Sequence, residues 1–368
     1  MTTTIRMRLA AGAGLFTTAA LVLAGCAAPP AETTDAAPSE PALDFTPCMV
    51  SDAGGFDDRS FNQLGYEGIT EAAGELGVEA ITVESAGEDD YAPNIESLLG
   101  QNCDLIVTVG FALSAATVEY ATANPDVMFA IVDDAADNDF DGVTDADNIK
   151  PILFDTAQAA FLAGYVMSDY TTTGVLGTYG GMEFPTVSIF MDGVKQGVDY
   201  YNEETGGDVE LLGWDGETGT FIGTFEAGTE SRNAAQNLID QNADILLPVG
   251  GPIYQSAVEA IADSGEDIAL VGVDADLTET DPENASLFLT SILKQIKVAV
   301  HDVVTEASAG ELDTTPYIGT LENGGVGIAP FHDFETLVSP DLQATVDELT
   351  QGIIAGDIEV TSYLSASK

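Results

Sequence analysis

From residue 46 onward, short hydrophobic runs alternate along the chain with longer stretches in which hydrophobic positions recur every three or four residues. The short runs predict buried β-strands, and the longer stretches predict amphipathic helices. The first series has predicted strands near residues 47–51, 80–84, 104–109, 128–132 and 150–154, with helices near 60–76, 92–101, 112–123 and 156–169. This alternation is typical of a parallel sheet covered by helices.

The same alternation then repeats. The second series has predicted strands near 174–179, 209–214, 244–249 and 268–273, with helices near 186–203, 229–241 and 253–264. Another strand–helix unit follows Asp274, and a last helix is expected near 340–355. Two such series predict an α/β fold of two Rossmann-like lobes. Because ligands of open parallel sheets bind beyond the carboxyl ends of the strands, we expect a ligand cleft between the lobes.

The two series also suggest domain boundaries. We assign residues 46–155 and about 278–320 to the first lobe, and residues 156–277 and about 321–336 to the second. Residues 337–368 form a C-terminal helical region that the sequence assigns to neither lobe.

The first 25 residues are typical of an export signal. Arg6 and Arg8 precede a hydrophobic segment whose end, LAGC at residues 23–26, is similar to a bacterial lipobox. The alternative is an ordinary secretory signal with an incidental cysteine. Residues 26–45 are rich in Ala, Pro, Thr and acidic residues, which predicts a flexible tether. We therefore expect a protein anchored to the outer face of the bacterial cytoplasmic membrane through lipidated Cys26.

The charge of the chain limits its partners. The sequence has 9 Lys and Arg against 62 Asp and Glu, a formal net charge of −53. Nucleic acids and anionic lipid headgroups bind through cationic side chains, so this surface excludes both as partners. The acidity itself favours solubility, including in a saline medium that screens the repulsion.

Two of the three cysteines stand at the starts of predicted strands, at Cys48 and Cys103. The first and third strands of a doubly wound parallel sheet are neighbours, so the two thiols can lie side by side. Because an exported protein can form disulfides, we expect a Cys48–Cys103 bond.

Polar residues and glycines recur directly after the predicted strands. They are Asp52, Gly110 and Asp133 in the first lobe and Gly250, Gly251 and Asp274 in the second. Buried carboxylates need hydrogen-bond donors, which sugar hydroxyls provide, and the rings of Phe61 and Phe225 could stack on a flat base. Plainer roles stay open at this point: Asp52 could cap a helix, Phe61 could be core, and the glycines could serve the turns.

Other chemistries find little support in the sequence. The chain has no G-x-x-x-x-G-K-[ST] phosphate loop, and His301 and His332 are too few and too far apart for a typical zinc site. Neither histidine lies near a serine of a G-x-S-x-G turn, so we expect no catalytic residue and no cofactor. Residues 137–142 match the first half of an EF-hand loop, but the twelfth position is Asn148 and no predicted helices flank the loop, which disfavours calcium.

The stretch SDAGGFDDRSFNQLGYEGI, at residues 51–69, resembles the opening motif of the basic membrane protein family, whose best-known members are purine-nucleoside receptor lipoproteins. The resemblance continues through GGMEFPTVSIFMDGVKQG, ADILLPVGG, LTSILKQIKVAV and GTLENGGVGIAPFHDF, and covers nearly everything after residue 45. It implies a type I periplasmic-binding-protein fold, in which two Rossmann-like lobes are joined by hinge strands and feed an ABC importer.

The resemblance also implies roles for the matched residues. Asp133 would hydrogen-bond the base, and Phe61 and Phe225 would stack on it. Asp274 and Lys294 would hold the ribose hydroxyls. The full expected ligand-binding set is Asp52, Phe61, Asn62, Asp133, Phe225, Gly250, Asp274 and Lys294, with Phe221 as an alternative to Phe225 because GTFIGTF contains the pattern twice.

We therefore expect a monomeric lipoprotein that captures a nucleoside, does no chemistry on it, and delivers it to an ABC permease and ATPase. Three acids around Lys294 favour nucleosides over nucleotides. The alternatives are another sugar- or base-bearing solute, or a surface lipoprotein acting as an adhesin or sensor partner; a nucleoside hydrolase fits less well. Asp57, Asp58 and Arg59 are assigned to the hydrogen bonding of their own loop and to the helix start.

Overall fold

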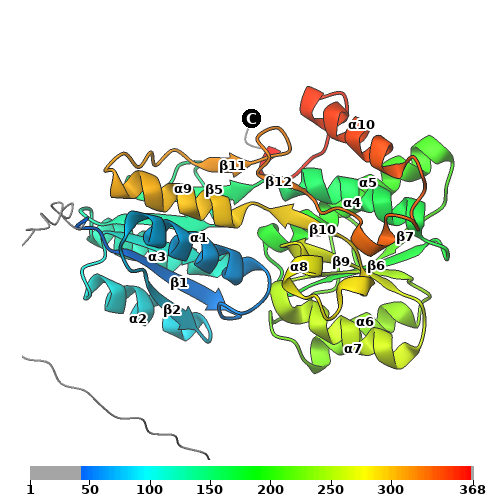
Figure 1. Cartoon of the computed structure of the whole chain (residues 1–368), viewed down its shortest axis with the longest axis horizontal. Helices are drawn as coiled ribbons and strands as arrows, with labels where there is room; N and C mark the ends of the chain where they lie inside the picture. Colours follow the sequence, from blue (N-terminus) through cyan, green and yellow to red (C-terminus); the bar gives the residue numbers. More distant parts are fainter. Residues whose placement is uncertain (1–42, 366–368) are drawn as a thin grey trace, which may run out of the picture. The chain divides into compact units, whose positions relative to one another are not determined.

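The computed structural model describes residues 43–365, which form two sheets of mostly parallel strands with helices on their faces (Figure 1). The predicted signal peptide, Cys26 and residues 26–42 of the predicted tether lie outside the described residues. Within residues 43–365, no helix combines the length and the apolar character that crossing a membrane requires.

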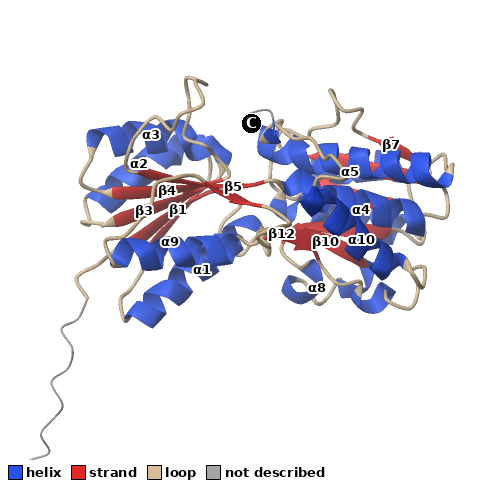
Figure 2. Cartoon of the chain, turned by 90° about the horizontal axis from the view of Figure 1, so that it is seen from above, coloured by secondary structure: helices blue, strands red, loops and turns tan. Residues whose placement is uncertain are grey.

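The first sheet has six parallel strands in the order β11-β5-β4-β3-β1-β2. They are β1 (Pro47–Ala53), β2 (Ile81–Ser85), β3 (Leu105–Val109), β4 (Met128–Val132), β5 (Ile149–Phe154) and β11 (Tyr317–Gly319). Its helices are α1 (Phe61–Leu76), α2 (Glu88–Leu99), α3 (Ser114–Ala123) and α9 (Ile296–Ser308). Figure 2 shows α2 and α3 over one face and α1 and α9 over the other. We call this sheet and its helices the first lobe.

The second sheet has the order β12-β10-β9-β8-β6-β7, in which β12 alone is antiparallel to its neighbour. Its strands are β6 (Val175–Gly180), β7 (Glu210–Leu212), β8 (Ile245–Val249), β9 (Ala269–Asp274), β10 (Phe288–Lys294) and β12 (Val326–Ile328). Its helices are α4 (Thr156–Tyr170), α5 (Pro185–Thr205), α6 (Thr229–Ile239), α7 (Tyr254–Ser264), α8 (Leu277–Thr280) and α10 (Leu342–Ala355). In Figure 1, α4, α5 and α10 lie on one side of this sheet and α6 and α7 on the other. This second lobe matches the repeat that the hydrophobic pattern predicts.

The burial of β1 shows how the first lobe is held together. Cys48 and Val50 belong to the hydrophobic cluster beneath α2 and α3, whereas Met49 belongs to the cluster beneath α1 and α9. Successive side chains of a strand point to opposite faces, so a strand covered on both sides is hydrophobic throughout. The structure joins Cys48 to Cys103, just before the neighbouring β3, in a disulfide with 5.9 Å between the Cα atoms, the pair that the sequence leads us to expect.

Helices α4 and α5 approach each other closely in the second lobe. A Cβ atom at Gly164 would collide with the backbone of Val194, and one at Gly197 would collide with the carbonyl of Phe161. Glycine at these two positions therefore permits the contact. The contact matters for the site because α5 carries Phe190, one of the residues that line the cavity described below.

Three chain crossings join the lobes. They lie at Asp155 between β5 and α4, at Gln295 between β10 and α9, and at residues 320–325 between β11 and β12. Backbone hydrogen bonds connect them: the Asp155 N–H donates to the carbonyl of Gly319 (2.8 Å), and the Gln295 N–H donates to the carbonyl of Gly325 (2.9 Å).

The lobe boundaries differ from the sequence assignment in one region. Residues 278–320 are assigned above to the first lobe, but β10 pairs with β9 in the second sheet, and the chain enters the first lobe only at α9. A hydrophobic run predicts a strand without specifying which sheet the strand extends, which is why the pattern misplaces β10. Helix α10 packs on α4, so the C-terminal helical region lies beside the second lobe.

Candidate functional site

A cavity between the two lobes is lined by residues that follow the carboxyl ends of strands in both sheets. The structure places all eight expected ligand-binding residues in its lining: Asp52, Phe61, Asn62 and Asp133 from the first lobe, and Phe225, Gly250, Asp274 and Lys294 from the second. Strand ends from distant parts of the chain thus meet at one place, as the topology of two facing parallel sheets requires.

Both lobes place residues with positive φ angles beside this cavity. Gly110 and Gly250 follow β3 and β8 with φ angles of 121° and 151°. Asp133 and Asp274 stand at the ends of β4 and β9 with φ angles of 66° and 67°. Positive φ is uncommon outside glycine, and Asp is among the residues that tolerate it best. Positive φ angles therefore recur at corresponding positions of the two lobes.

Lys294 lines the cavity with a side chain that is 3% exposed. Its Nζ donates to Asp133 Oδ2 across the cleft (2.5 Å) and lies 3.2 Å from Asp274 Oδ1 in its own lobe. Burial alone would lower the pKa of Lys294, but the two carboxylates outweigh burial and raise it. The ammonium also lies 5.0 Å from the ring centroids of Phe61 and Phe190. Lys294 is therefore a charged group shared by both lobes.

Asp52 and Asn62 form a second polar group in the first lobe. Asn62 Nδ2 donates to Asp52 Oδ1 (2.8 Å), while Asn62 Oδ1 is buried and accepts no hydrogen bond from the described residues. Burial raises the pKa of Asp52 to about 8, against the opposing hydrogen bond from Asn62, and the nearby Asp58, Asp133 and Asp274 raise it further. Asp52 is consequently protonated over much of the neutral range and can donate a hydrogen bond as well as accept one.

Asp58 holds the start of α1 in place, in keeping with its assignment to the helix start. Its carboxylate accepts from the backbone N–H groups of Ser60 (2.9 Å), Asn62 (2.9 Å) and Gln63 (3.0 Å). Burial raises the pKa of Asp58, and these N–H groups oppose that shift. Asp58 also lines the cavity, so the carboxylate that fixes Phe61 and Asn62 at the first turn of α1 adds to the acidity of the site.

The second lobe contributes an aromatic wall. Phe225 and Phe184 have ring centroids 6.0 Å apart, and Phe184 lies 5.0 Å from Phe111, which reaches across from the first lobe. Phe221, the competing candidate, is not part of the cavity lining; its ring meets the edge of Trp214 at 6.0 Å. The structure therefore separates the two halves of GTFIGTF, with Phe225 at the cavity and Phe221 in packing.

Sequence reasoning missed two members of this wall. Phe184 follows β6 within five residues, so the rule of examining residues after strands could have found it. Phe190 lies inside α5, where an aromatic residue has the same appearance as an ordinary core residue.

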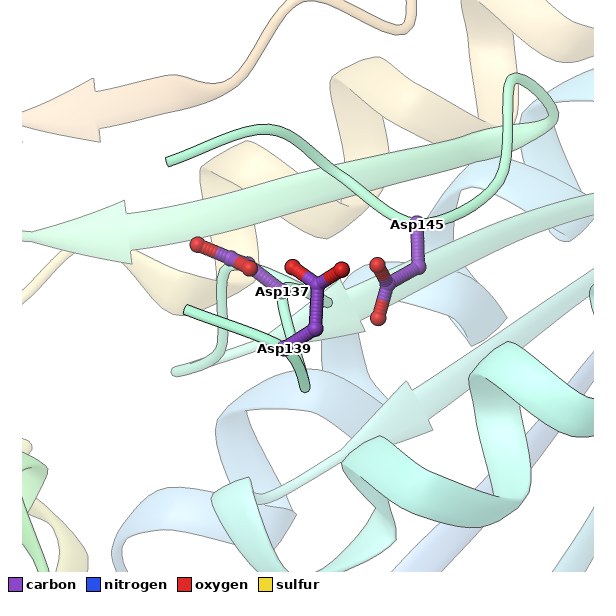
Figure 3. A group of neighbouring side chains, drawn as sticks. All are labelled: Asp137, Asp139 and Asp145. Carbon is purple, nitrogen blue, oxygen red and sulfur yellow. The ribbon is translucent and has the colours of Figure 1, made fainter. Parts of the chain in front are cut away.

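The acidic loop after β4 lies outside the cavity. The carboxylate oxygens of Asp137, Asp139 and Asp145 lie within 4.8 Å of one another (Figure 3). Asp145, rather than Asp141, completes this group, so its spacing is not that of an EF-hand. The carboxylate of Asp137 accepts from the N–H of Gly142 (2.8 Å), a hydrogen bond within the loop.

The two histidines also lie away from the cavity. His301 Nε2 lies 3.2 Å from Glu75 Oε2 where α9 meets α1, and His332 Nε2 lies 2.7 Å from Asp276 Oδ2.

Comparisons with known proteins agree with this geometry. A family model described as Bmp, ABC transporter substrate-binding protein PnrA-like, matches residues 45–362. The CD4+ T-cell-stimulating antigen of Listeria monocytogenes is 30% identical over 86% of this chain and 88% of its own length. The ABC transporter nucleoside-binding protein BmpA of Lactococcus lactis is 24% identical over 97% of this chain and 100% of its own. A solved ABC transporter solute-binding protein from Aeropyrum pernix is 25% identical, with a TM-score of 0.76 over 86% of this chain and 93% of its own.

Proposed function

The chain belongs to the Bmp family of PnrA-like ABC transporter substrate-binding proteins, and from this premise we propose that it is a lipoprotein that binds a nucleoside between its lobes. Substrate-binding proteins of this family act outside the cytoplasm and are not enzymes. In the proposed function, lipidated Cys26 holds the protein at the membrane, and the bound nucleoside passes to an ABC permease and its ATPase. The name of the Lactococcus lactis relative supports the class of ligand.

The aromatic rings support a flat ligand. Phe61 comes from the first lobe and Phe225 from the second, and both line the cavity. Stacking on aromatic rings suits a nucleobase, whose two faces are both available. A base between the rings contacts both lobes at once. Such a ligand stabilises the closed arrangement of the lobes, because it makes both sets of contacts only there.

One buried oxygen atom carries the most weight for a ligand with hydrogen-bond donors. Asn62 Oδ1 accepts no hydrogen bond within residues 43–365, whereas Asp274 Oδ1 is paired with the charged Lys294 at 3.2 Å. Buried acceptors in native proteins nearly always find a donor. Ribose hydroxyls would donate to Asp274 and accept from Lys294, and an amino or imino group of the base would donate to Asn62.

The charges of the cavity support a ligand without phosphate. Four carboxyl groups line it, from Asp52, Asp58, Asp133 and Asp274, and Lys294 is the cation among the described lining residues. Lys294 is already paired with two of those carboxylates. A phosphate would enter a region of negative charge with no free cation to meet it. The neutral nucleoside is therefore the proposed ligand rather than the nucleotide.

A thermal-shift panel tests the proposal. Purified protein is heated with purine and pyrimidine nucleosides, free bases, ribose, inositol and nucleoside monophosphates. We expect nucleosides to raise the melting temperature most, because only they fill both the aromatic and the hydroxyl-binding parts. Chromatography of the same samples shows whether free base is released. If only simple sugars raise the melting temperature, the ligand is a sugar or polyol and the proposed nucleoside is wrong. If free base is released, the protein acts on its ligand and the binding-only role is wrong.

A further inference from the structure

The loop between β1 and α1 contacts the second lobe at a place outside the cavity. Arg59, in this loop, forms an ion pair with Asp281, which follows α8. The Asp281 side chain is fully buried, and the Arg59 side chain is 38% exposed. Asp281 also accepts from Tyr254 Oη (2.9 Å) and Asn284 Nδ2 (2.8 Å), both within its own lobe. These donors hold the carboxylate where Arg59 meets it.

Two further contacts flank this ion pair. Thr280 Oγ1 of the second lobe donates to the backbone carbonyl of Arg59 (2.7 Å). Ser60 Oγ donates to the carbonyl of Val273 (2.9 Å) and lies 3.1 Å from Asp274 Oδ2. Neighbouring residues of one first-lobe loop thus make contacts of three kinds with the second lobe: charge to charge, hydroxyl to backbone, and hydroxyl to carboxylate.

The loop is fixed before it reaches the other lobe. Asp58 binds the N–H groups of the helix start, and the N–H of Phe56 donates to Glu84 Oε1 (2.7 Å). Arg59 itself has a φ angle of 62°, in the left-handed region that side chains other than Asn and Asp seldom adopt. Because the loop is already ordered, little conformational entropy is lost when the Arg59 side chain forms its contact. The contact therefore retains more of its stabilising free energy.

We propose that Arg59, Thr280 and Asp281 form an interlobe latch that stabilises the closed arrangement and so sets how tightly any solute is held. None of the three lines the cavity, so the latch acts without touching the solute. Opening the cleft separates the buried Asp281 carboxylate from the cation paired with it, which disfavours opening. Apparent affinity scales with the fraction of protein in the binding-competent state, so a weaker latch lowers affinity for every solute by the same factor.

The test compares Arg59→Gln with a matched control. Arg232→Gln removes the same charge from an arginine of similar exposure, since Arg232 is 41% exposed, but its partners Glu259 and Asp263 are exposed and lie within the second lobe. Arg59→Lys keeps the charge, and Thr280→Val removes the hydroxyl that binds the Arg59 carbonyl. For each protein, small-angle scattering gives the radius of gyration without solute, and calorimetry gives the affinities for two nucleosides.

We expect Arg59→Gln to enlarge the radius of gyration without solute. It should also lower the affinity for each nucleoside about 3- to 10-fold and leave the ratio of the two affinities unchanged. Arg59→Lys and Thr280→Val should lie between this variant and the wild type, and Arg232→Gln should match the wild type. The latch is overturned if Arg59→Gln matches Arg232→Gln in both measurements. This inference rests on the proposed function only for the calorimetric readout. If no nucleoside binds the wild type, the proposed function fails while scattering still decides the latch.

Discussion

In the first lobe, the turn after β3 brings Gly110 against the carboxylate of Asp52, whereas in the second lobe the equivalent turn after β8 brings Gly250 against the ring of Phe225. Both glycines have positive φ angles, 121° at Gly110 and 151° at Gly250, although their ψ angles differ (141° and 60°). The side chains facing them are opposite in character. One turn therefore supports a wall that forms hydrogen bonds, and the other supports a wall that stacks.

Each lobe also places side chains of the other character in the cleft. Phe61 brings an aromatic ring to the acidic first lobe, and Lys294 brings a charge from the aromatic second lobe to Asp133. A repeated fold thus yields a site without twofold symmetry, because the strands fix where side chains stand while the sequence chooses their chemistry. A ligand with flat faces and polar edges matches this division.

The largest effect is expected from removing the charge that joins the two walls. Lys294→Met leaves Asp133 and Asp274 buried and without their cation, so we expect nucleoside affinity to fall by roughly 100-fold or more and the free energy of unfolding to fall by about 3 kcal/mol. Calorimetry and urea unfolding measure the two quantities. Lys195→Met, in an exposed pair with Asp199 on α5, is the control and should change neither appreciably. Affinity within threefold of wild type would show that Lys294 serves the fold alone.

A smaller effect is expected from the aromatic wall. Phe225→Ala removes one stacking partner, and we expect about 20-fold weaker nucleoside binding, within the range measured for loss of a base–aromatic stack. Phe221→Ala instead removes packing on Trp214, so it should lower the free energy of unfolding by about 2 kcal/mol while leaving affinity within twofold. Equal losses of affinity in the two variants would mean that the comparison of the walls is wrong.

The acidic wall should show itself in pH dependence. The pKa of Asp52 is raised to about 8 in the folded protein, so the unfolded chain releases this proton first as pH rises. The stability contributed by protonated Asp52 is complete below its unfolded pKa and is lost as pH rises through the folded pKa, with a slope of at most about 1.4 kcal/mol per pH unit. Asp52→Asn removes that slope but retains an acceptor for Asn62. The free energies of unfolding of the wild type and of Asp52→Asn, measured with urea between pH 5 and 9, should diverge with pH. If the two plots against pH run parallel, the pKa of Asp52 is not raised.

The sequence predicted the strands and helices well where burial leaves a clear pattern. Fully buried strands such as β3 (LIVTV) and β8 (ILLPV) are mostly hydrophobic, and the positions after them are where the expected site residues stand. Strands β11 and β12 have three residues each, too few to show any period. The sheet that β10 joins depends on pairing with β9, which no local pattern records.

The site was predictable to a similar extent. Asp133 and Asp274 follow strands, so they could be named in advance, and so could Phe184 by the same rule. Phe190 could not, because it lies inside α5, where the sequence gives no sign that its ring lines the cavity. The proposed latch could not be predicted from the sequence for another reason. Thr280 and the Arg59 carbonyl that it contacts are 221 positions apart, and no pattern in either segment indicates the other.

Calorimetric titration of the purified protein with a purine nucleoside and with its 5′-monophosphate tests the central claim most directly. The two ligands share base and ribose and differ only in the phosphate, which the acidic wall should reject. We expect one nucleoside per protein and an affinity for the monophosphate at least about 100-fold weaker, because Lys294 is already shared between two carboxylates. Equal or tighter binding of the monophosphate, or no heat from any nucleoside, would contradict the account.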